Sequence, residues 1–178
     1  MTFHRLSESV LHQGPLISVV EVGLRGPDGE SFTREVVRHP GAVVVVPVTD
    51  SGAFVLVRQY RAAVGEELLE VPAGKRDVAG EPPCDTAARE LAEEVGRVAG
   101  RMDLLARFYN SPGFCDELTH LYLARDLRIV PSDRQGVEER NMAVVEVPFG
   151  RVDSMIDNGE IVDAKSIIGL TLALKHLQ

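Results

Sequence analysis

Cysteine is scarce in this sequence, and its scarcity excludes two classes of small protein. Cys84 and Cys115 are the only two cysteines, with no CxxC pair and no cluster of cysteine with histidine. A disulfide-stapled scaffold or a zinc site needs more such residues. The five histidines also lack a metal-like spacing, and we expect His39 and His120 to be structural. Few cysteines suit a reducing compartment, so we expect a cytoplasmic protein.

Long apolar runs and an excess of positive charge are also missing. The longest apolar run, residues 42–48, is far too short to span a membrane, and the N-terminal stretch lacks the apolar core of a signal peptide. Acidic residues outnumber basic residues 27 to 19, for a net charge of −8. We therefore expect neither a membrane nor a nucleic acid as partner. An anionic substrate would need local cations, either arginines or metal ions.

Two common catalytic motifs are absent as well. The chain has no GxSxG of a serine hydrolase and no GxxxxGK[ST] of a P-loop. What it does have is an ordinary soluble profile, with 44% hydrophobic and 26% charged residues. Its 178 residues suit one domain with a short extra layer, and they are enough to form a buried core without disulfide bonds or structural metal ions.

The N-terminal part of the chain predicts a β-hairpin. Residues 16–24 are rich in β-branched side chains, residues 31–38 alternate, and the turn sequence at 26–29 separates them. His39-Pro40-Gly41 then marks a boundary. We therefore expect an N-terminal hairpin subdomain, residues 1–40, and a main domain, residues 41–178.

The main domain alternates between predicted strands and helices. Strands are expected at 42–48, 54–59, 67–72, 104–109, 118–124 and 142–147, with a loop at 73–83. Helices are expected at 86–95, which ends at Gly96, at 152–158, and after Asp163, which is a suitable N-cap. Together these elements predict a mixed α/β (α+β) protein with helices packed on the faces of a sheet.

The helix expected at 86–95 carries a row of glutamates. At about 100° per residue, Glu90 and Glu94 lie about 40° apart, and Glu93 is close to them. We expect this row to lie opposite the apolar stripe that includes Leu91. Carboxylates about 5 Å apart repel by roughly 0.8 kcal/mol per pair in water, and by about 3 kcal/mol at an effective dielectric of 20.

Two interpretations of this row remain open on spacing alone. Arg89–Glu93 and Glu93–Arg97 are i,i+4 pairs, so the helix could be a solvated surface helix with salt bridges. If the row lines a cleft instead, a divalent cation would relieve the repulsion. Oxygen ligands without nitrogen or sulfur favour Mg²⁺ or Mn²⁺ over zinc.

Residues 74–97 resemble the Nudix box, G-x5-E-x7-R-E-U-x-E-E-x-G-U, in which U is apolar. The matching positions are Gly74, Glu81, Arg89, Glu90, Leu91, Glu93, Glu94 and Gly96. Six residues instead of five separate the first two, and Arg97 replaces the last apolar residue. Neither departure touches the glutamate row. The resemblance implies an α/β/α sandwich and a pyrophosphohydrolase that uses two or more Mg²⁺ or Mn²⁺ ions.

The resemblance also implies roles for individual residues. Glu90 and Glu94 would be the main metal ligands, supported by Glu93 and by the backbone carbonyl of Ala73. Glu81 and Arg89 would pair to hold the loop. The general base would come from a later loop, at Glu139 or, second, at Glu138. Metal ions would neutralise the diphosphate and activate a bound water, which the base orients or deprotonates.

The whole chain is similar to the ADP-ribose pyrophosphatase branch of the family. The segments that carry this similarity are 33–42, 58–61, 70–74 and 111–114, and Pro112 lies in a loop at the position typical of that branch. The resemblance implies that the substrate is bound by Arg61, Arg58, Arg34, Glu35, Glu70, Pro112 and Phe114. Arg61 suits a phosphate, because a guanidinium can bind it with two hydrogen bonds. Arg34 and Glu35 would contact adenine, or else form an exposed ion pair.

The expected reaction is hydrolysis of ADP-ribose to AMP and ribose 5-phosphate. GDP-mannose or another nucleotide sugar is the alternative substrate, and a non-catalytic nucleotide-binding module is a further alternative. Relatives often have aromatic residues where this chain has Leu16-Ile17, so Phe114 or Tyr109 would have to stack on the base, unless both lie in the core. In this branch the N-terminal hairpin pairs with a second subunit, which implies a homodimer.

Overall fold

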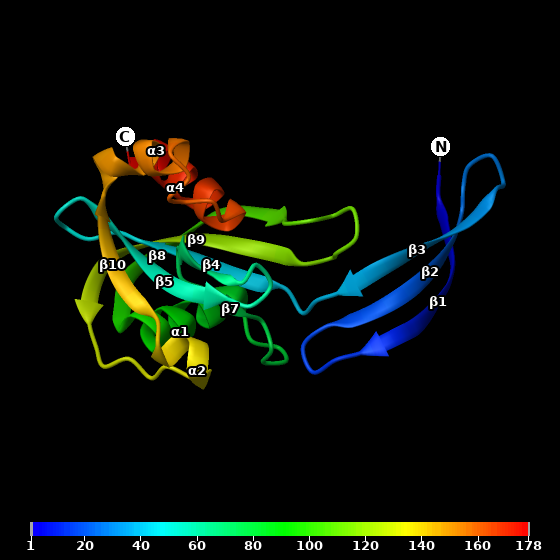
Figure 1. The fold of residues 1–178 in the computed structure, drawn as a ribbon, viewed down its shortest axis with the longest axis horizontal. Helices are drawn as coiled ribbons and strands as arrows, with labels where there is room; N and C mark the ends of the chain where they lie inside the picture. Colours follow the sequence, from blue (N-terminus) through cyan, green and yellow to red (C-terminus); the bar gives the residue numbers. More distant parts are fainter. Residues whose placement is uncertain (1, 178) are drawn as a thin grey trace. The chain divides into compact units, whose positions relative to one another are not determined.

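The computed structural model describes residues 2–177, which form two compact units (Figure 1). Unit 1 comprises residues 2–41 and 108–119, and unit 2 comprises residues 42–107 and 120–177. Segment 108–119 belongs with the N-terminal strands because it bonds to them. The N–H of Val37 donates to the carbonyl of Phe114 at 2.7 Å, and the N–H of Asp116 donates to the carbonyl of Val37 at 3.1 Å.

Unit 1 is built on a three-stranded antiparallel sheet in the order β1-β2-β3. The strands are β1 (His4–Gln13), β2 (Ser18–Arg25) and β3 (Ser31–Arg38). The expected hairpin is confirmed as β2 and β3, which pair in register from Ser18 with Arg38 to Arg25 with Ser31. Strand β1 was not predicted. All ten of its residues are exposed, so it has no alternation of apolar and polar residues that could reveal it.

Unit 2 contains two sheets, in the orders β7-β4-β9-β8 and β10-β5-β6. Their strands are β4 (Ala42–Pro47), β5 (Ala53–Arg61), β6 (Glu66–Glu70), β7 (Ala73–Lys75), β8 (Arg97–Tyr109), β9 (Leu118–Ile129) and β10 (Ala143–Pro148). Strands β8 and β9 are longer than predicted, and both continue into unit 1. Strand β7 lies within the segment that was expected to be a loop. It forms because Ala42, Val43 and Val44 pair with it.

The helices of unit 2 are α1 (Pro83–Val95), α2 (Gly136–Arg140), α3 (Val152–Asp157) and α4 (Ala164–Leu177), with a 3-10 turn η1 (Phe149–Arg151) before α3. Helix α1 begins three residues earlier than predicted, because a proline is well tolerated at the first helical position. Helix α2 is a single turn where a loop was expected. No helix among residues 2–177 combines the length and apolarity that a membrane crossing requires.

Strand β4 lies between two helical layers, which explains its run of valines. Val43 and Val45 belong to the core cluster that includes Leu91 of α1. On the other face, Gly169 of α4 lies so close that a Cβ would be 3.0 Å from Val46 and 3.1 Å from Leu121. A strand buried on both faces reads as a continuous apolar stretch. The expected α/β/α sandwich is confirmed.

Candidate active site

Helix α1 presents the glutamate row and ends where the sequence indicates. Gly96 adopts a left-handed conformation with φ of 64°, and its N–H donates to the carbonyls at the end of the helix. A glycine takes this conformation without a steric penalty, so the helix stops there. Ala87, Leu91 and Val95 are buried, as the apolar stripe predicts, but so are Thr86 and Glu94.

The burial of Glu94 corrects the expectation that the glutamates lie opposite the apolar stripe. Glu94 lies only about 60° from Leu91 around the helix, and it is 3% exposed. Its Oε2 accepts a hydrogen bond from the N–H of Ala73 at 3.2 Å. Glu90 packs against Gly74, where a Cβ would lie 2.0 Å from the Glu90 carboxyl carbon. The glycine is therefore required for β7 to approach the helix.

Three carboxylates in this region influence one another. Burial, followed by the charges of Glu90 and Glu139, raises the pKa of Glu94 to about 8. Burial also raises the pKa of Glu90 to about 7, although the charge of Arg89 acts to lower it. Each of these carboxylates would ionise more readily beside an added positive charge. A divalent cation with a preference for oxygen ligands fits this set of donors.

Arg89 occupies part of the row in this structure. Its Nη1 lies 2.9 Å from Glu90 and 3.0 Å from Glu93. Within residues 2–177, no group of three or more histidine, cysteine, aspartate or glutamate side chains is gathered in a ready-made metal cluster. The predicted pairing of Arg89 with Glu81 is confirmed at 3.4 Å.

The second ion pair expected on the helix, Glu93–Arg97, does not form. Arg97 follows the helix stop and begins β8, where its Nη2 lies 3.7 Å from Glu146 of β10. An i,i+4 pair requires both residues to be on one helix. The interpretation of α1 as a solvated helix with salt bridges along its surface is therefore wrong at two residues: Arg97 is not on the helix, and Glu94 is buried.

Arg61 and Glu70 form a bidentate ion pair between β5 and β6. Both guanidinium contacts, from Nε and Nη2, measure 2.7 Å. Glu70 is fully buried, while the Arg61 side chain is 38% exposed. Lys165 of α4 lies 3.6 Å from Glu70 and 2.5 Å from Asp163. The hydrogen bond with Glu70 raises the pKa of Arg61, and the charge of Glu94 also reaches this guanidinium.

Arg58 and Arg61 do not converge, although both are on β5. Side chains alternate between the two faces of a strand, so Arg61 shares a face with Gln59, and Arg58 lies on the other face. Arg58 is exposed, and it makes no ion pair with any residue from 2 to 177. Lys165 was missed by the sequence analysis, because only the tertiary fold brings α4 to the end of β6.

Helix α2 distinguishes the two candidate bases. Glu139 is half-buried, its charge acts on both Glu90 and Glu94, and its Oε2 accepts a 2.6 Å hydrogen bond from the N–H of Gln135. Glu138 is exposed. Arg134, which the sequence analysis missed, holds this segment against the end of α1. It donates to the carbonyl of Glu94 at 2.9 Å and to that of Met142 at 2.6 Å.

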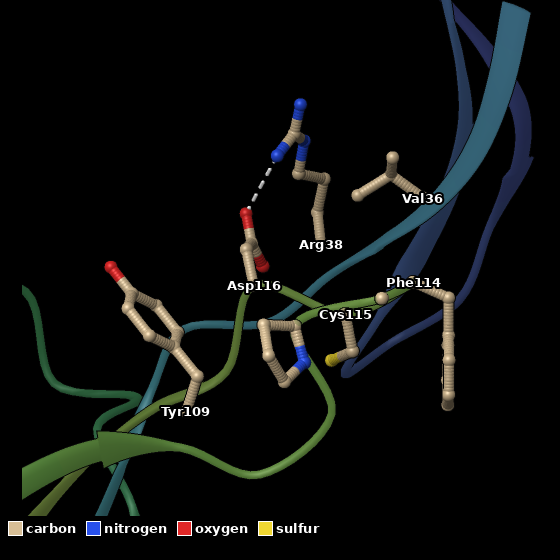
Figure 2. A pocket seen from close by; sticks show the side chains of 8 residues that line it. Val36, Arg38, Tyr109, Phe114, Cys115 and Asp116 are labelled. Atoms are coloured by element: carbon tan, nitrogen blue, oxygen red, sulfur yellow. Dashed lines mark hydrogen bonds and ion pairs between the residues drawn. The ribbon is translucent and has the colours of Figure 1, made fainter.

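Unit 1 contains a cavity of about 290 Å³ between β3 and the segment at 109–116 (Figure 2). Its lining residues are Val36, Arg38, Tyr109, Pro112, Gly113, Phe114, Cys115 and Asp116. Arg38 and Asp116 pair across it at 2.8 Å. Tyr109 is 55% exposed and Phe114 is 58% exposed, so the alternative that they lie in the core is wrong.

Arg34 and Glu35 lie on β3 of the same unit, and both are exposed. The expected exposed ion pair between them is absent from the described residues. Instead, the Arg34 guanidinium lies over the Phe32 ring at 4.6 Å and donates to the carbonyl of Thr33. Glu35 faces Glu21 of β2 across the sheet. Neighbouring residues of a strand point to opposite faces, which separates the two side chains.

Comparison with known proteins agrees with the geometry of the site. The NUDIX domain model matches residues 38–165. The ADP-ribose pyrophosphatase of Bacillus subtilis (strain 168) is 35% identical, covering 97% of this chain and 91% of the relative. That of Mycobacterium tuberculosis is 42% identical, covering 94% and 81%. A GDP-mannose pyrophosphatase of Shigella flexneri is 34% identical, covering 80% and 82%.

A solved structure has the same fold. The crystal structure of an ADP compounds hydrolase superposes with a TM-score of 0.85 at 24% sequence identity, covering 99% of this chain and 95% of that chain. The matched family model spans most of the chain and includes the complete glutamate row. The chain therefore belongs to the Nudix family, and it is a pyrophosphohydrolase.

Proposed function

We propose that this enzyme hydrolyses ADP-ribose to AMP and ribose 5-phosphate with the help of a divalent cation. The observation that carries the proposal is the group of Glu90, Glu94 and Glu139, buried or half-buried, whose charges act on one another. Two relatives named ADP-ribose pyrophosphatases, similar along nearly the whole chain, support the choice of substrate.

Glu90 and Glu94 would hold the cation, with Glu93 and the carbonyl of Ala73 as supporting ligands. Their oxygen donors fit Mg²⁺ or Mn²⁺, and we propose that two or more ions bind. When bound, such ions neutralise the diphosphate and lower the pKa of a coordinated water. Arg89 must then release part of its contact with Glu90 and Glu93, while its pairing with Glu81 keeps the loop in place.

Glu139 is the proposed general base, and Glu138 is the second choice. A water molecule attacks one phosphorus of the diphosphate and gives its proton to the Glu139 carboxylate. The bond from that phosphorus to the bridging oxygen breaks, and the leaving phosphate keeps the bridging oxygen. The reaction consumes one water and yields two phosphate monoesters. Glu139 fits this role better than Glu138 because it is half-buried and its charge acts on Glu90 and Glu94.

Arg61 is the proposed phosphate ligand. Glu70 cannot reach an open surface, because it is fully buried beneath Arg61. We therefore propose that Glu70 acts as a positioning residue, which fixes the guanidinium so that its exposed part can bind a phosphate oxygen. Arg58 lies on the other face of β5 and is the weaker candidate.

For the nucleoside we propose the residues of unit 1. The cavity beside Pro112 and Phe114 offers an exposed aromatic ring on which a base can stack. Arg34 and Glu35 are exposed and do not pair with each other, so both are candidates to contact a base. The resemblance implies that the N-terminal strands pair with a second subunit. The exposed apolar residues Val10 and Leu11 of β1 support such a homodimer. We propose that residues 1–40 form the dimer and that residues 41–178 are the catalytic domain. Few cysteines support a cytoplasmic location.

A panel of nucleotide sugars tests the substrate. Each compound is incubated with the enzyme and Mg²⁺ or Mn²⁺, then treated with phosphatase, and the released phosphate is measured. We expect ADP-ribose to have the highest kcat/KM. GDP-mannose is the alternative, supported by the relative of that activity. A kcat/KM for GDP-mannose about tenfold above that for ADP-ribose, or about 1.4 kcal/mol in transition-state binding, would show that the proposed substrate is wrong.

A further inference from the structure

Two arginines and a buried histidine gather at one end of the four-stranded sheet of unit 2. Arg76 directly follows β7, Arg107 is near the end of β8, and His120 is near the start of β9. Strand β4 lies between β7 and β9, and β8 is next to β9. The backbone of Ala42, the first residue of β4, is near enough to act on the pKa of His120, and Ala42 pairs with Lys75, the neighbour of Arg76.

The three side chains are close enough to affect one another. Burial, followed by the charges of Arg76 and then Arg107, lowers the pKa of His120. The same two arginines also act on Tyr122, two residues further along β9 and on the same face. Two guanidinium charges therefore lie near enough to act on both side chains, and they favour a neutral imidazole at His120.

Arg76 and His120 each have a buried atom without a partner in the part of the chain that the structure describes. Within residues 2–177, Nε of Arg76 and Nδ1 of His120 are buried side-chain atoms without a hydrogen bond. His120 is only 8% exposed. Over the same residues, neither Arg76 nor Arg107 has a carboxylate within ion-pair distance. The nearby Glu81 is held by Arg89, and Asp85 is exposed at the start of α1.

An unpaired buried polar atom is costly, so Nε of Arg76 and Nδ1 of His120 favour a ligand, and Arg107, which is exposed, is open to bind the same ligand. The donors are two guanidinium groups, which bind the oxygens of a tetrahedral oxyanion with two hydrogen bonds each. His120 adds an acceptor. A neutral imidazole has one lone-pair nitrogen, and the site we propose uses Nδ1, which has no hydrogen-bond partner within residues 2–177.

We propose that Arg76, Arg107 and His120 form a second anion site, which binds an inorganic hydrogen-phosphate ion. The arginines would donate to the phosphate oxygens, and the P–OH group would donate to Nδ1 of His120. Sulfate has the same shape and charge but no proton to donate, so it should bind more weakly. The residues differ from those of the proposed pyrophosphate site, and binding requires no divalent cation.

Calorimetric titration of the full chain with inorganic phosphate tests this proposal. The protein is kept in EDTA, so that no metal ion can bring phosphate to Glu90 and Glu94. We expect saturable binding, and a dissociation constant for sulfate at least about tenfold higher, which corresponds to about 1.4 kcal/mol. Absence of phosphate binding, or equal binding of sulfate and phosphate, would overturn the proposal. Neither outcome depends on which nucleotide the enzyme hydrolyses.

Charge-matched variants locate the site. R76Q and R107Q should each weaken phosphate binding by about tenfold or more, and R107K should recover part of the loss. R128Q is the control, because Arg128 is an exposed arginine of the same sheet, on β9. Equal weakening in R128Q would show nonspecific attraction and would refute the site. H120L should remove the preference for phosphate over sulfate. If H120L does not fold, the comparison of sulfate with phosphate binding in R76Q and R107Q, which keep His120, still tests whether His120 accepts the phosphate proton.

Discussion

The buried ion pair of Arg61 and Glu70 allows a prediction about the order of two destabilising substitutions. R61M leaves the Glu70 carboxylate, which is fully buried, without its bidentate partner. Removing one partner of a buried pair costs about 3–5 kcal/mol. Lys165 at 3.6 Å compensates only in part. We therefore expect R61M to lower the free energy of unfolding by about 3 kcal/mol.

E70Q should lower the free energy of unfolding less than R61M does, because the group that loses its partner, the Arg61 guanidinium, is accessible to water. The Arg61 side chain is 38% exposed, so a guanidinium that loses its partner can be hydrated. Glutamine also keeps one acceptor for Arg61. We expect E70Q to lower the free energy of unfolding by about 1–2 kcal/mol. E67Q, an exposed position on the same strand, should change it by less than about 0.5 kcal/mol.

Urea denaturation followed by circular dichroism at pH 7 measures these differences. The double variant should cost less than the sum of the two single variants, because the interaction can be lost only once. The reasoning would be refuted if E70Q cost as much as R61M or more. Both variants should also raise the KM for ADP-ribose, since Arg61 is the proposed phosphate ligand. An unchanged KM in R61M would count against that role.

Three further substitutions test other parts of the site. E94Q should abolish turnover of ADP-ribose with Mg²⁺, and unchanged activity would contradict the metal-binding role. The same substitution should leave the unfolding free energy of the metal-free protein at pH 7 nearly unchanged. Burial raises the pKa of Glu94 to about 8, so this carboxyl group is already largely protonated at that pH. G74A should lose most activity, since its methyl would lie 2.0 Å from the Glu90 carboxyl carbon, and wild-type kinetics would refute the claim that this contact is rigid. D163N should lower stability at neutral pH by about 1–2 kcal/mol. Although burial acts to raise it, Lys165 lowers the pKa of Asp163. The stabilisation by ionised Asp163 is present above the unfolded-state pKa of about 3.9 and is lost as the pH falls through the folded-state pKa. The difference in unfolding free energy between D163N and wild type should therefore disappear in denaturation series at acid pH. A difference that stays constant with pH would contradict this reasoning.

Several local features could be predicted because neighbouring residues specify them. The turn at 26–29 joins β2 and β3, and Gly96 ends α1, since both depend on backbone conformations that glycine favours. The valines of β4 indicate a strand covered on both faces. The spacing of the Nudix box identifies the family, because its glutamates belong to one helix.

Other features depend on contacts between distant segments, and no local pattern reveals them. Strand β1 has no buried face, so only its pairing with β2 makes it a strand. Glu94 is buried because β7 closes over α1, and Arg97 turns to Glu146 because β8 leaves the helix axis.

The sequence by itself determined the helix, its row of carboxylates and the family to which the chain belongs, since these follow from spacing along a few turns. Only the tertiary structure decided which carboxylates are buried and which positively charged side chain each one contacts. Burial and pairing depend on atoms that are near in space but distant along the chain, as with Glu70 and Lys165.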